Sequence, residues 1–352
     1  MQQKKDIRTY SLEKLKSFFN EHNEKSFRAQ QVYEWIWGKH CSSFEEMTNL
    51  SKKTRAFLHR NFTISITRLQ EEQKSEDGTI KNVFRCNDGK IMEGVLIPSE
   101  GRMTACVSSQ VGCSLACEFC ATARLKRERN LIAGEIYDQV KLINDQAVRH
   151  YNTALTNIVY MGMGEPLLNY KEVIKSIEHI TSNYGLAMSP KRITFSTVGI
   201  AKMIEKLGDE EVKFNLALSL HAANDEARNK IMAINKKNDL STLAEALKHF
   251  YNKTGTKVTY EYIVFKDIND KEENALELVE FCNIIPCKVN IIEYNPIDNG
   301  TLKQAEPEKL DMYKDILEKN GIIVNVRRSR GKDIDAACGQ LANKNKATEM
   351  DV

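Results

Sequence analysis

From Gly101 onward the chain alternates short apolar segments, typical of strands, with longer amphipathic segments, typical of helices. The apolar segments that we interpret as strands are 104–108, 157–161, 192–197, 214–220, 258–265, 288–294 and 322–326. Helical patterns between them include 133–149, 171–182, 240–253, 272–282 and 307–319. Such alternation predicts a parallel sheet whose outer face is covered by helices. Six or seven strand–helix units fit an incomplete α/β barrel better than a closed barrel of eight.

The rest of the chain adds smaller parts to this barrel, as expected for 352 residues, which exceed the usual size of one core. Residues 11–60 carry apolar stripes at helical spacing. Residues 64–97 have strand-like runs broken at two Asp-Gly dipeptides, which favour tight hairpin turns. We therefore predict an α/β protein with four parts: helices at 1–62, an antiparallel β meander acting as a connector at 63–100, a partial (β/α)6 barrel at 101–330 and a C-terminal segment at 331–352.

Composition argues against a membrane or secreted protein. No apolar run approaches the roughly 20 residues of a membrane span. The first residues, Met-Gln-Gln-Lys-Lys-Asp, lack the apolar stretch of a secretory signal. Nine cysteines, three of them close together, suit a metal site in a reducing compartment better than a disulfide framework. We therefore expect a cytoplasmic protein with no membrane partner.

Cys113, Cys117 and Cys120 form a CxxxCxxC motif directly after the first predicted barrel strand, and no fourth cysteine follows nearby. A cubic iron–sulfur cluster has four irons, so three thiolates leave one iron without a protein ligand. That open iron can bind and reduce a small molecule. A structural zinc site, or a closed cluster with Cys106 as the fourth ligand, is the alternative. The spacing favours an open [4Fe-4S] cluster and is typical of radical S-adenosylmethionine (SAM) enzymes.

Candidate SAM-binding residues follow the later strands. The second strand ends in Met161-Gly-Met-Gly164-Glu165-Pro166, where Gly164 permits close approach of a ligand and Glu165 can accept hydrogen bonds from the amino group of SAM. Further candidates at strand ends are Ser196, Ser219, Leu220, His221 and Asn295. Each has an ordinary alternative, such as a turn glycine, a packed histidine or an Asn-Pro turn. Their shared position at the carboxyl ends of strands favours the functional interpretation.

The net charge of +3 is small, but basic residues gather at two places beside the expected chemistry. One group is Arg124, Lys126, Arg127 and Arg129, and the other is Arg327, Arg328, Arg330 and Lys332. Cations placed there would neutralise and position a polyanion such as RNA. An ordinary solvated surface is the alternative for both groups.

Five stretches resemble the dual-specificity RNA adenine-C2 methyltransferases, a family of radical SAM enzymes acting on 23S ribosomal RNA and on transfer RNA. They are FRAQQVYEW at 27–35, CVSSQVGC at 106–113, MGMGEPLLN at 161–169, SLHA at 219–222 and DIDAACGQL at 333–341. Val198 departs from the serine that many members carry there. A sister family, which methylates C8 of the same ribosomal adenine, tends to have alanine where this chain has Pro166. The resemblance therefore favours C2, with C8 methylation as the alternative.

The resemblance implies methylation of adenine 2503 in 23S rRNA and adenine 37 in tRNA, with two SAM molecules per turnover and electrons from a reductase or flavodoxin-type donor. It implies that Cys338 takes a methyl group from one SAM and carries it covalently to C2. Glu93 would remove the C2 proton, and Cys106 would release the product by forming a disulfide with Cys338. The helices at 1–62 would dock RNA. From the residues alone, both cysteines could equally be buried structural residues and Glu93 a solvated carboxylate.

Two other functions stay open on the sequence. A radical SAM activase that acts on a protein glycine would share the cluster motif but has no evident need of Cys338 or the basic groups. A non-enzymatic iron–sulfur or zinc protein that only binds RNA would share the basic groups but would not cleave SAM.

Overall fold

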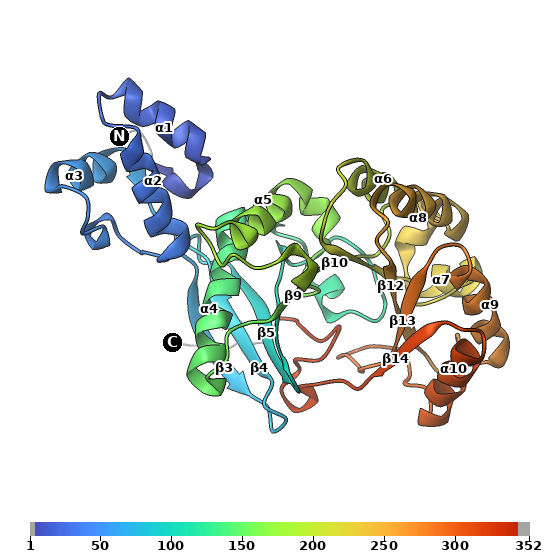
Figure 1. The fold of residues 1–352 in the computed structure, drawn as a ribbon. Coiled ribbons are helices and arrows are strands. Elements are labelled where there is room, and N and C mark those ends of the chain that lie inside the picture. Colours follow the sequence, from blue (N-terminus) through green and yellow to red (C-terminus); the bar gives the residue numbers. More distant parts are fainter. Residues whose placement is uncertain (1–3, 344–352) are drawn as a thin grey trace.

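Ten strands form one mostly parallel sheet in the computed structural model, which describes residues 4–343 (Figure 1). Residues 1–3 and 344–352, which belong to the predicted N-terminal and C-terminal parts, lie outside the described residues. Neighbouring strands follow the order β14-β13-β12-β11-β10-β9-β6-β5-β4-β3. In this described part the end strands β14 and β3 do not pair with each other, so the barrel is incomplete, as predicted.

The parallel part of the sheet contains seven strands, each within two residues of a predicted segment. They are β6 Arg102–Cys106, β9 Asn157–Tyr160, β10 Ile193–Thr197, β11 Asn215–Ser219, β12 Val258–Val264, β13 Cys287–Glu293 and β14 Ile323–Arg327. A parallel strand between covering helices is buried on both faces, and β12 is buried along its whole length. Such strands are therefore visible in the sequence as continuous apolar runs.

Seven helices connect these strands and cover the outer face of the sheet (Figure 1). They are α4 Ala133–Tyr151, α5 Tyr170–Thr181, α6 Ala201–Asp209, α7 Asp225–Ile231, α8 Leu240–Thr254, α9 Glu272–Cys282 and α10 Pro307–Lys319. Helix α8 shows how local sequence sets their limits: the Asp239 carboxylate accepts the Thr242 N–H at its start, and Gly255, with φ of +64°, ends it. Among the described residues, no helix has the length and apolar character needed to cross a membrane. The predicted fold class, α/β with a partial barrel, is confirmed.

The antiparallel meander extends the barrel sheet. Its strands β3 Arg68–Lys74, β4 Ile80–Arg85 and β5 Ile91–Ser99 pair in sequence order, and β5 pairs with β6. Gly78 and Gly89 have φ of +85° and +80° in the two hairpin turns that the Asp-Gly dipeptides predict. Because β6 also pairs with β9 on its other side, the meander and the barrel share one hydrogen-bonded frame. The division of the chain into four domains stays a prediction.

Two small sheets accompany the large one. The pair β1 Lys5–Asp6 and β2 Phe62–Thr63 joins the two ends of an N-terminal helical bundle made of α1 Leu12–Glu21, α2 Phe27–Tyr33 and α3 Lys52–Asn61 (Figure 1). The pair β7 Gln110–Val111 and β8 Arg129–Asn130 encloses the CxxxCxxC loop. The helical bundle packs on the barrel through Trp37, whose ring stacks on His179 of α5 with the centroids 3.6 Å apart.

A buried ion pair joins the helical bundle to the barrel. Arg8 Nη1 and His40 Nε2 each lie 2.8 Å from the carboxylate of Asp138 in α4. The backbone N–H of Thr67, just before the meander, donates to the same carboxylate at 2.8 Å. Burial alone would raise the pKa of Asp138, but Arg8 and His40 hold it below its ordinary value. Segments far apart in the sequence thus meet at one carboxylate.

Replacement of Asp138 should destabilise the protein strongly. Asp138→Ala removes the nearer carboxylate of the buried Arg8 guanidinium and leaves only Asp6, 3.6 Å from its Nε, so we expect the free energy of unfolding to fall by about 3–5 kcal/mol in urea denaturation. Asp145→Ala is the matched control, because Asp145 lies on the same helix and pairs with Lys141 in solvent. That control should change stability by less than about 0.5 kcal/mol. Equal losses in the two variants would contradict a buried anchoring role for Asp138.

Candidate active site

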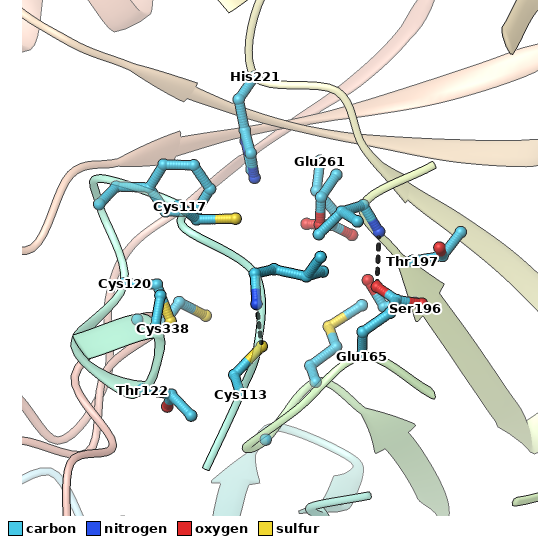
Figure 2. A pocket seen from close by; sticks show the side chains of 18 of the residues that line it. Cys113, Cys117, Cys120, Thr122, Glu165, Ser196, Thr197, His221, Glu261 and Cys338 are labelled. Carbon is cyan, nitrogen blue, oxygen red and sulfur yellow. Dashed lines mark hydrogen bonds between the residues drawn. The ribbon is translucent and has the colours of Figure 1, made fainter. Parts of the chain in front are cut away.

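The CxxxCxxC loop leaves the sheet after β6 and lies at the carboxyl ends of the parallel strands. A β-bridge between Cys117 and Met232 fixes its backbone, and the Leu115 N–H donates to Cys113 Sγ at 3.4 Å. Cys113, Cys117 and Cys120 line one cavity (Figure 2), called the cluster cavity from here on. The structure thus gathers the three cysteines of the motif at one place.

The three thiols suit a multinuclear cluster better than a single ion. Burial, and to a smaller extent the neighbouring thiols, raise the pKa of each thiol, which reaches about 11 for Cys113. Thiolates held this close need a compensating cation. Within residues 4–343 these sulfurs are not gathered within 4.8 Å of one another, whereas a tetrahedral zinc would hold them about 3.8 Å apart. Cys106 does not line this cavity, so the donor set fits an iron–sulfur cluster with three cysteine ligands.

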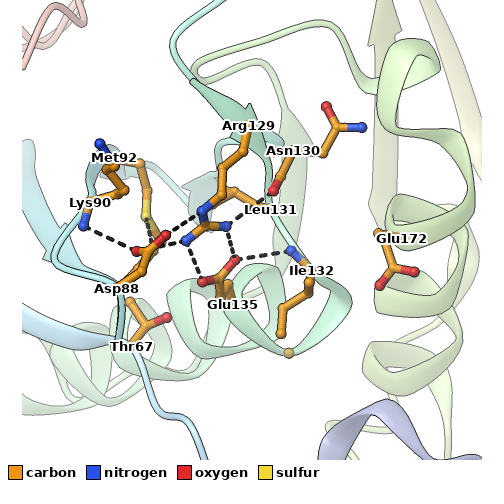
Figure 3. A network of polar contacts seen from close by, with 12 residues as sticks. Thr67, Asp88, Lys90, Met92, Arg129, Asn130, Leu131, Ile132, Glu135 and Glu172 are labelled. Carbon is orange, nitrogen blue, oxygen red and sulfur yellow. Dashed lines mark hydrogen bonds and ion pairs between the residues drawn. The ribbon is translucent and has the colours of Figure 1, made fainter. Parts of the chain in front are cut away.

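A second group of side chains, of the types that bind metal ions, already surrounds the cationic guanidinium of Arg129. Cys86, Asp88 and Glu135 place their ligand atoms within 4.8 Å of one another. Figure 3 shows the Arg129 guanidinium donating to both carboxylates, at 2.6 and 3.0 Å to Asp88 and at 2.7 and 2.8 Å to Glu135. The bonds to Glu135 and Asp88 raise the pKa of Arg129 although its burial opposes this. This network joins β8 to the start of α4 and is structural.

Glu165, which follows β9, is a buried acceptor in the cluster cavity. Its carboxylate accepts the Leu167 N–H at 3.0 Å and the Val198 N–H at 2.9 Å. Burial raises the pKa of Glu165 to about 7, although these N–H groups oppose the shift. Gly164 has φ of +93°, and a Cβ there would lie 2.5 Å from the Gln110 side chain, so this turn requires glycine. A ligand ammonium group would supply the positive partner that ionised Glu165 lacks.

Other predicted SAM-binding residues lie on the same cavity. Ser196, Ser219 and His221 line it at the ends of β10 and β11. Figure 2 shows Ser196 and His221 at this cavity. The His221 ring has a structural bond, because its Nδ1 accepts the Ile263 N–H at 3.1 Å. Burial lowers the pKa of His221 to about 3, so the ring is neutral. His221 can therefore contribute shape and a neutral ring to the site but no charge.

Arg228 of α7 fixes the backbone of these strand ends, and the sequence analysis missed it. Its guanidinium donates to the Leu220 carbonyl at 3.0 Å and to the Val198 carbonyl at 2.7 Å. The Leu220 side chain is buried outside the cluster cavity, so Leu220 acts through its backbone. Arg228 is fully buried, which lowers its pKa to about 10. Because α7 also carries Asp225 and Lys230, its sequence looks like that of an exposed helix.

Cys338 lies where two cavities meet. It lines the cluster cavity and also a second cavity with Cys106, called the cysteine cavity from here on. Burial raises the pKa of Cys106 to about 12, and nearby Arg327 opposes the shift. Arg327 lines both cavities and is held at 3.0 Å by Glu261, a second buried residue that sequence reasoning missed. Asn295 lies outside the cluster cavity, and its Nδ2 donates to the Cys338 carbonyl at 3.4 Å.

Two features that the resemblance implies, the Cys106–Cys338 disulfide and the proton-accepting Glu93, differ in this structure from the arrangement that we expected. All nine cysteines are free, so Cys106 and Cys338 are not joined by a disulfide in this structure. Glu93 lies on β5, outside the cluster cavity, and its carboxylate accepts backbone N–H groups of Ala342 and Asn343. The C-terminal segment therefore contacts Glu93 at 342–343 and lines the cluster cavity at Cys338 and Gly339.

The two basic groups of the sequence are partly neutralised by carboxylates. The ion pairs are Arg129 with Asp88 and Glu135, Arg327 with Glu261, and Lys332 with Glu293. Lys126 and Arg127, by contrast, line an open cavity between β7 and β8, beside the CxxxCxxC loop. This surface keeps a basic character next to the site.

Comparisons with known proteins agree along nearly the whole chain. Residues 5–64 match the family model for the ribosomal RNA large subunit methyltransferase N-terminal domain, and residues 107–279 match the radical SAM superfamily. A protein of Flavobacterium psychrophilum, named as a probable dual-specificity RNA methyltransferase RlmN, is 60% identical over 342 residues, covering 97% of this chain and 99% of its own. This chain belongs to the RlmN family.

RlmN proteins from more distant bacteria and a solved structure support the same assignment. The relative from Salinibacter ruber, with the same printed name, is 44% identical and covers 96% of this chain and 94% of its own. A crystal structure of a radical SAM methyltransferase from Sphaerobacter thermophilus is 36% identical, with a TM-score of 0.90 over 96% of this chain and 99% of its own. The RlmN-family fold is thus a radical SAM partial barrel.

Glu165 should control SAM affinity in a pH-dependent way. Because the pKa of Glu165 is about 7 in the ligand-free protein, its carboxyl group is largely neutral below pH 7 and must lose a proton to pair with the SAM amino group. We expect SAM affinity, measured by calorimetry, to fall up to about tenfold per pH unit below that value. Glu165→Gln should weaken binding about tenfold or more at pH 8 and remove this dependence. Glu205→Gln, at an exposed position of α6, is the control, and an unchanged profile in Glu165→Gln would contradict the assignment.

Proposed function

We propose that this chain is a radical SAM methyltransferase that methylates C2 of adenine in 23S rRNA and in tRNA through a methylated cysteine. The observation that carries the proposal is that Cys338 lines both the cluster cavity and the cysteine cavity. Cys338 would accept a methyl group at the cluster cavity and would later be attacked by another thiol at the cysteine cavity. It therefore needs access to both cavities. The RlmN relatives, which are named as dual-specificity RNA methyltransferases, support RNA as the substrate class. Both RNAs are cytoplasmic, which places the reaction there.

The chemistry of C2 explains why such a site is needed. C2 of adenine lies between two ring nitrogens and has no lone pair, so it cannot attack the SAM methyl group as ordinary acceptors do. A carbon radical can add to such an electron-poor carbon. When bound, a [4Fe-4S] cluster held by Cys113, Cys117 and Cys120, supplied with electrons by a reductase or flavodoxin-type protein, would reduce SAM to a 5′-deoxyadenosyl radical. Glu165 would hold the SAM amino group, with Ser196, Ser219 and His221 near the rest of the molecule. Asn295 would act on the site through its bond to the Cys338 carbonyl.

Cys338 would act first, as a nucleophile. Its thiol loses a proton, its sulfur bonds to the methyl carbon of one SAM, and the sulfonium C–S bond of that SAM breaks. After losing one hydrogen atom during the second SAM-dependent step, the methyl carbon bonds to C2. The adduct would then lose one electron, which a bound cluster in its oxidised state would accept, and the C2 proton, for which Glu93 is the proposed acceptor. The product at this stage is an RNA base joined to Cys338 through a methylene group.

Cys106 would release the product. Its sulfur attacks the sulfur of Cys338, the bond from that sulfur to the methylene carbon breaks, and the electron pair stays with the carbon, which takes a proton to become the methyl group. The new Cys106–Cys338 disulfide then needs two electrons and two protons from a thiol reductant before the next turnover. The shared cysteine cavity supports this exchange, and Arg327 beside both thiols favours the attacking thiolate.

The decisive test is the identity of the methylated base. Reduced, cluster-loaded enzyme incubated with SAM and with 23S rRNA or tRNA should produce 2-methyladenine, read by mass spectrometry of nucleosides. Cys338→Ala should lower product by at least about a thousandfold, because no other thiol lines both cavities. Detection of 8-methyladenine would instead assign the enzyme to the sister reaction. Normal methylation by Cys338→Ala would refute the covalent route.

Loss of Cys106 should trap the reaction after bond formation to RNA. Cys106→Ala removes the attacking sulfur but leaves Cys338 in place, so a covalent protein–RNA adduct should accumulate and be visible on a denaturing gel. Cys86→Ala, which removes a buried thiol that lines neither cavity, serves as the control and should leave no adduct. Release of free product at the wild-type rate by Cys106→Ala would contradict the exchange step.

A further inference from the structure

The end of the described chain is fastened to strand β5 by one carboxylate. Glu93 Oε2 accepts the backbone N–H of Ala342 at 2.8 Å and that of Asn343 at 3.2 Å. Asn343 Nδ2 adds a bond to the Ile91 carbonyl, also on β5, at 3.1 Å. Lys81 Nζ lies 4.0 Å from the other oxygen of Glu93. Glu93 is only 1% exposed, so its carboxylate is stabilised by these contacts and not by water.

Residues 331–343, called the strap from here on, carry Cys338 between two such attachments. At the start of the strap, the Gly331 N–H donates to Asp77 Oδ2 at 2.9 Å in the first hairpin turn of the meander. Near its end, the strap lies on the segment just after the CxxxCxxC motif, where the Thr122 hydroxyl donates to the Leu341 carbonyl at 2.6 Å. At its end is Glu93. The position of Cys338 therefore depends on contacts with both the meander and the loop.

We propose that Glu93 is a positioning residue that latches the strap and so holds Cys338 at the cluster cavity, and that this latch opens before Glu93 can take a proton from the RNA base. The inference rests on the function proposed for Cys338. In the latched state, one carboxylate oxygen receives two N–H groups and the other faces an ammonium group. A carboxylate in that setting does not contact the cavity where a base would have to lie.

Glu93 cannot hold the strap and accept a proton from the RNA base at the same time. Two charge-assisted bonds stabilise the anion and make it a poor base while they last. Burial already raises the pKa of Glu93 in the latched state, where Lys81 and the two backbone N–H groups oppose the shift. When residues 342–343 move away, these two N–H groups no longer oppose it, and the carboxylate becomes a better proton acceptor. Movement of the strap would thus change the reach of Cys338 and the basicity of Glu93 together. Methyl acceptance belongs to the latched state and proton removal to the open one.

Two measurements without RNA separate the latch from a simple base. The first is hydrogen–deuterium exchange of the amides of residues 342 and 343, in protein without added SAM. The second is the single-turnover rate of Cys338 methylation by SAM in cluster-loaded enzyme, read as the mass of the Cys338 peptide. Neither contains a C2 proton, so a residue that acts only as base would change neither.

Glu93→Gln should speed exchange at 342–343 at least tenfold and slow Cys338 methylation about tenfold, with the SAM dissociation constant unchanged. Asn343→Gly keeps Glu93 and both backbone donors, and glycine accepts the positive φ of 51° at this position, but it loses the bond to Ile91. It should shift both measurements in the same direction by a smaller factor. Glu100→Gln, at an exposed position just after β5, should match the wild type.

The proposal is overturned if Glu93→Gln loses only RNA turnover and keeps wild-type exchange and Cys338 methylation. It is also overturned if exchange rises in both variants while Cys338 methylation stays normal. Should Glu93→Gln fail to fold, Asn343→Gly carries the same test. Absence of Cys338 methylation in the wild type would refute the proposed function itself, and the exchange data would still show whether the strap is latched.

Discussion

The two hydrogen-bonded ladders of strand β6 are the constraint on which the site depends. On one side Cys106 pairs with Val95 of the antiparallel meander, and on the other it pairs with Val159 of the parallel barrel. The CxxxCxxC motif begins at Cys113, seven residues after β6 ends at Cys106 and just past the short strand β7. A shift of β6 by one residue would turn Cys106 to the opposite face of the sheet and displace the loop with it. The ladders thus set the relation between the cluster cavity and the cysteine cavity.

Much of this architecture is predictable from sequence because its causes are local. A strand such as β12, buried on both faces, is mainly apolar, with Glu261 as its charged exception, and a tight hairpin turn needs residues like Asp-Gly. The CxxxCxxC motif and the Gly164-Glu165 turn are equally local, so the sequence predicts these residues of the cluster cavity, although not Glu261. The site residues' roles nevertheless stay predictions, because position alone does not establish chemistry.

The features that could not be predicted from the sequence depend on contacts between segments that are far apart along the chain. Glu93 bonds to a residue 249 positions later, and Arg8 bonds to one 130 positions later. Arg228 sits on a short helix among other charged residues and is buried only because three loops converge on its guanidinium. The same limit applies to the two basic groups, because the sequence does not show that Arg129, Arg327 and Lys332 form ion pairs. Their charge in sequence is neutralised by carboxylates brought from other elements.

The backbone contact between the strap and the CxxxCxxC loop couples the order of these two segments. Gly339 has φ of +84°, and a Cβ there would lie 2.9 Å from the Phe119 carbonyl, so the two backbones touch where a side chain would separate them. The Ala121 N–H also donates to the Gly339 carbonyl at 2.7 Å. Anything that orders residues 117–122, such as a bound cluster, therefore also favours the position of Cys338. By the same linkage a latched strap stabilises the loop, so the thiol that we propose to carry the methyl group is placed only where the cofactor site is formed.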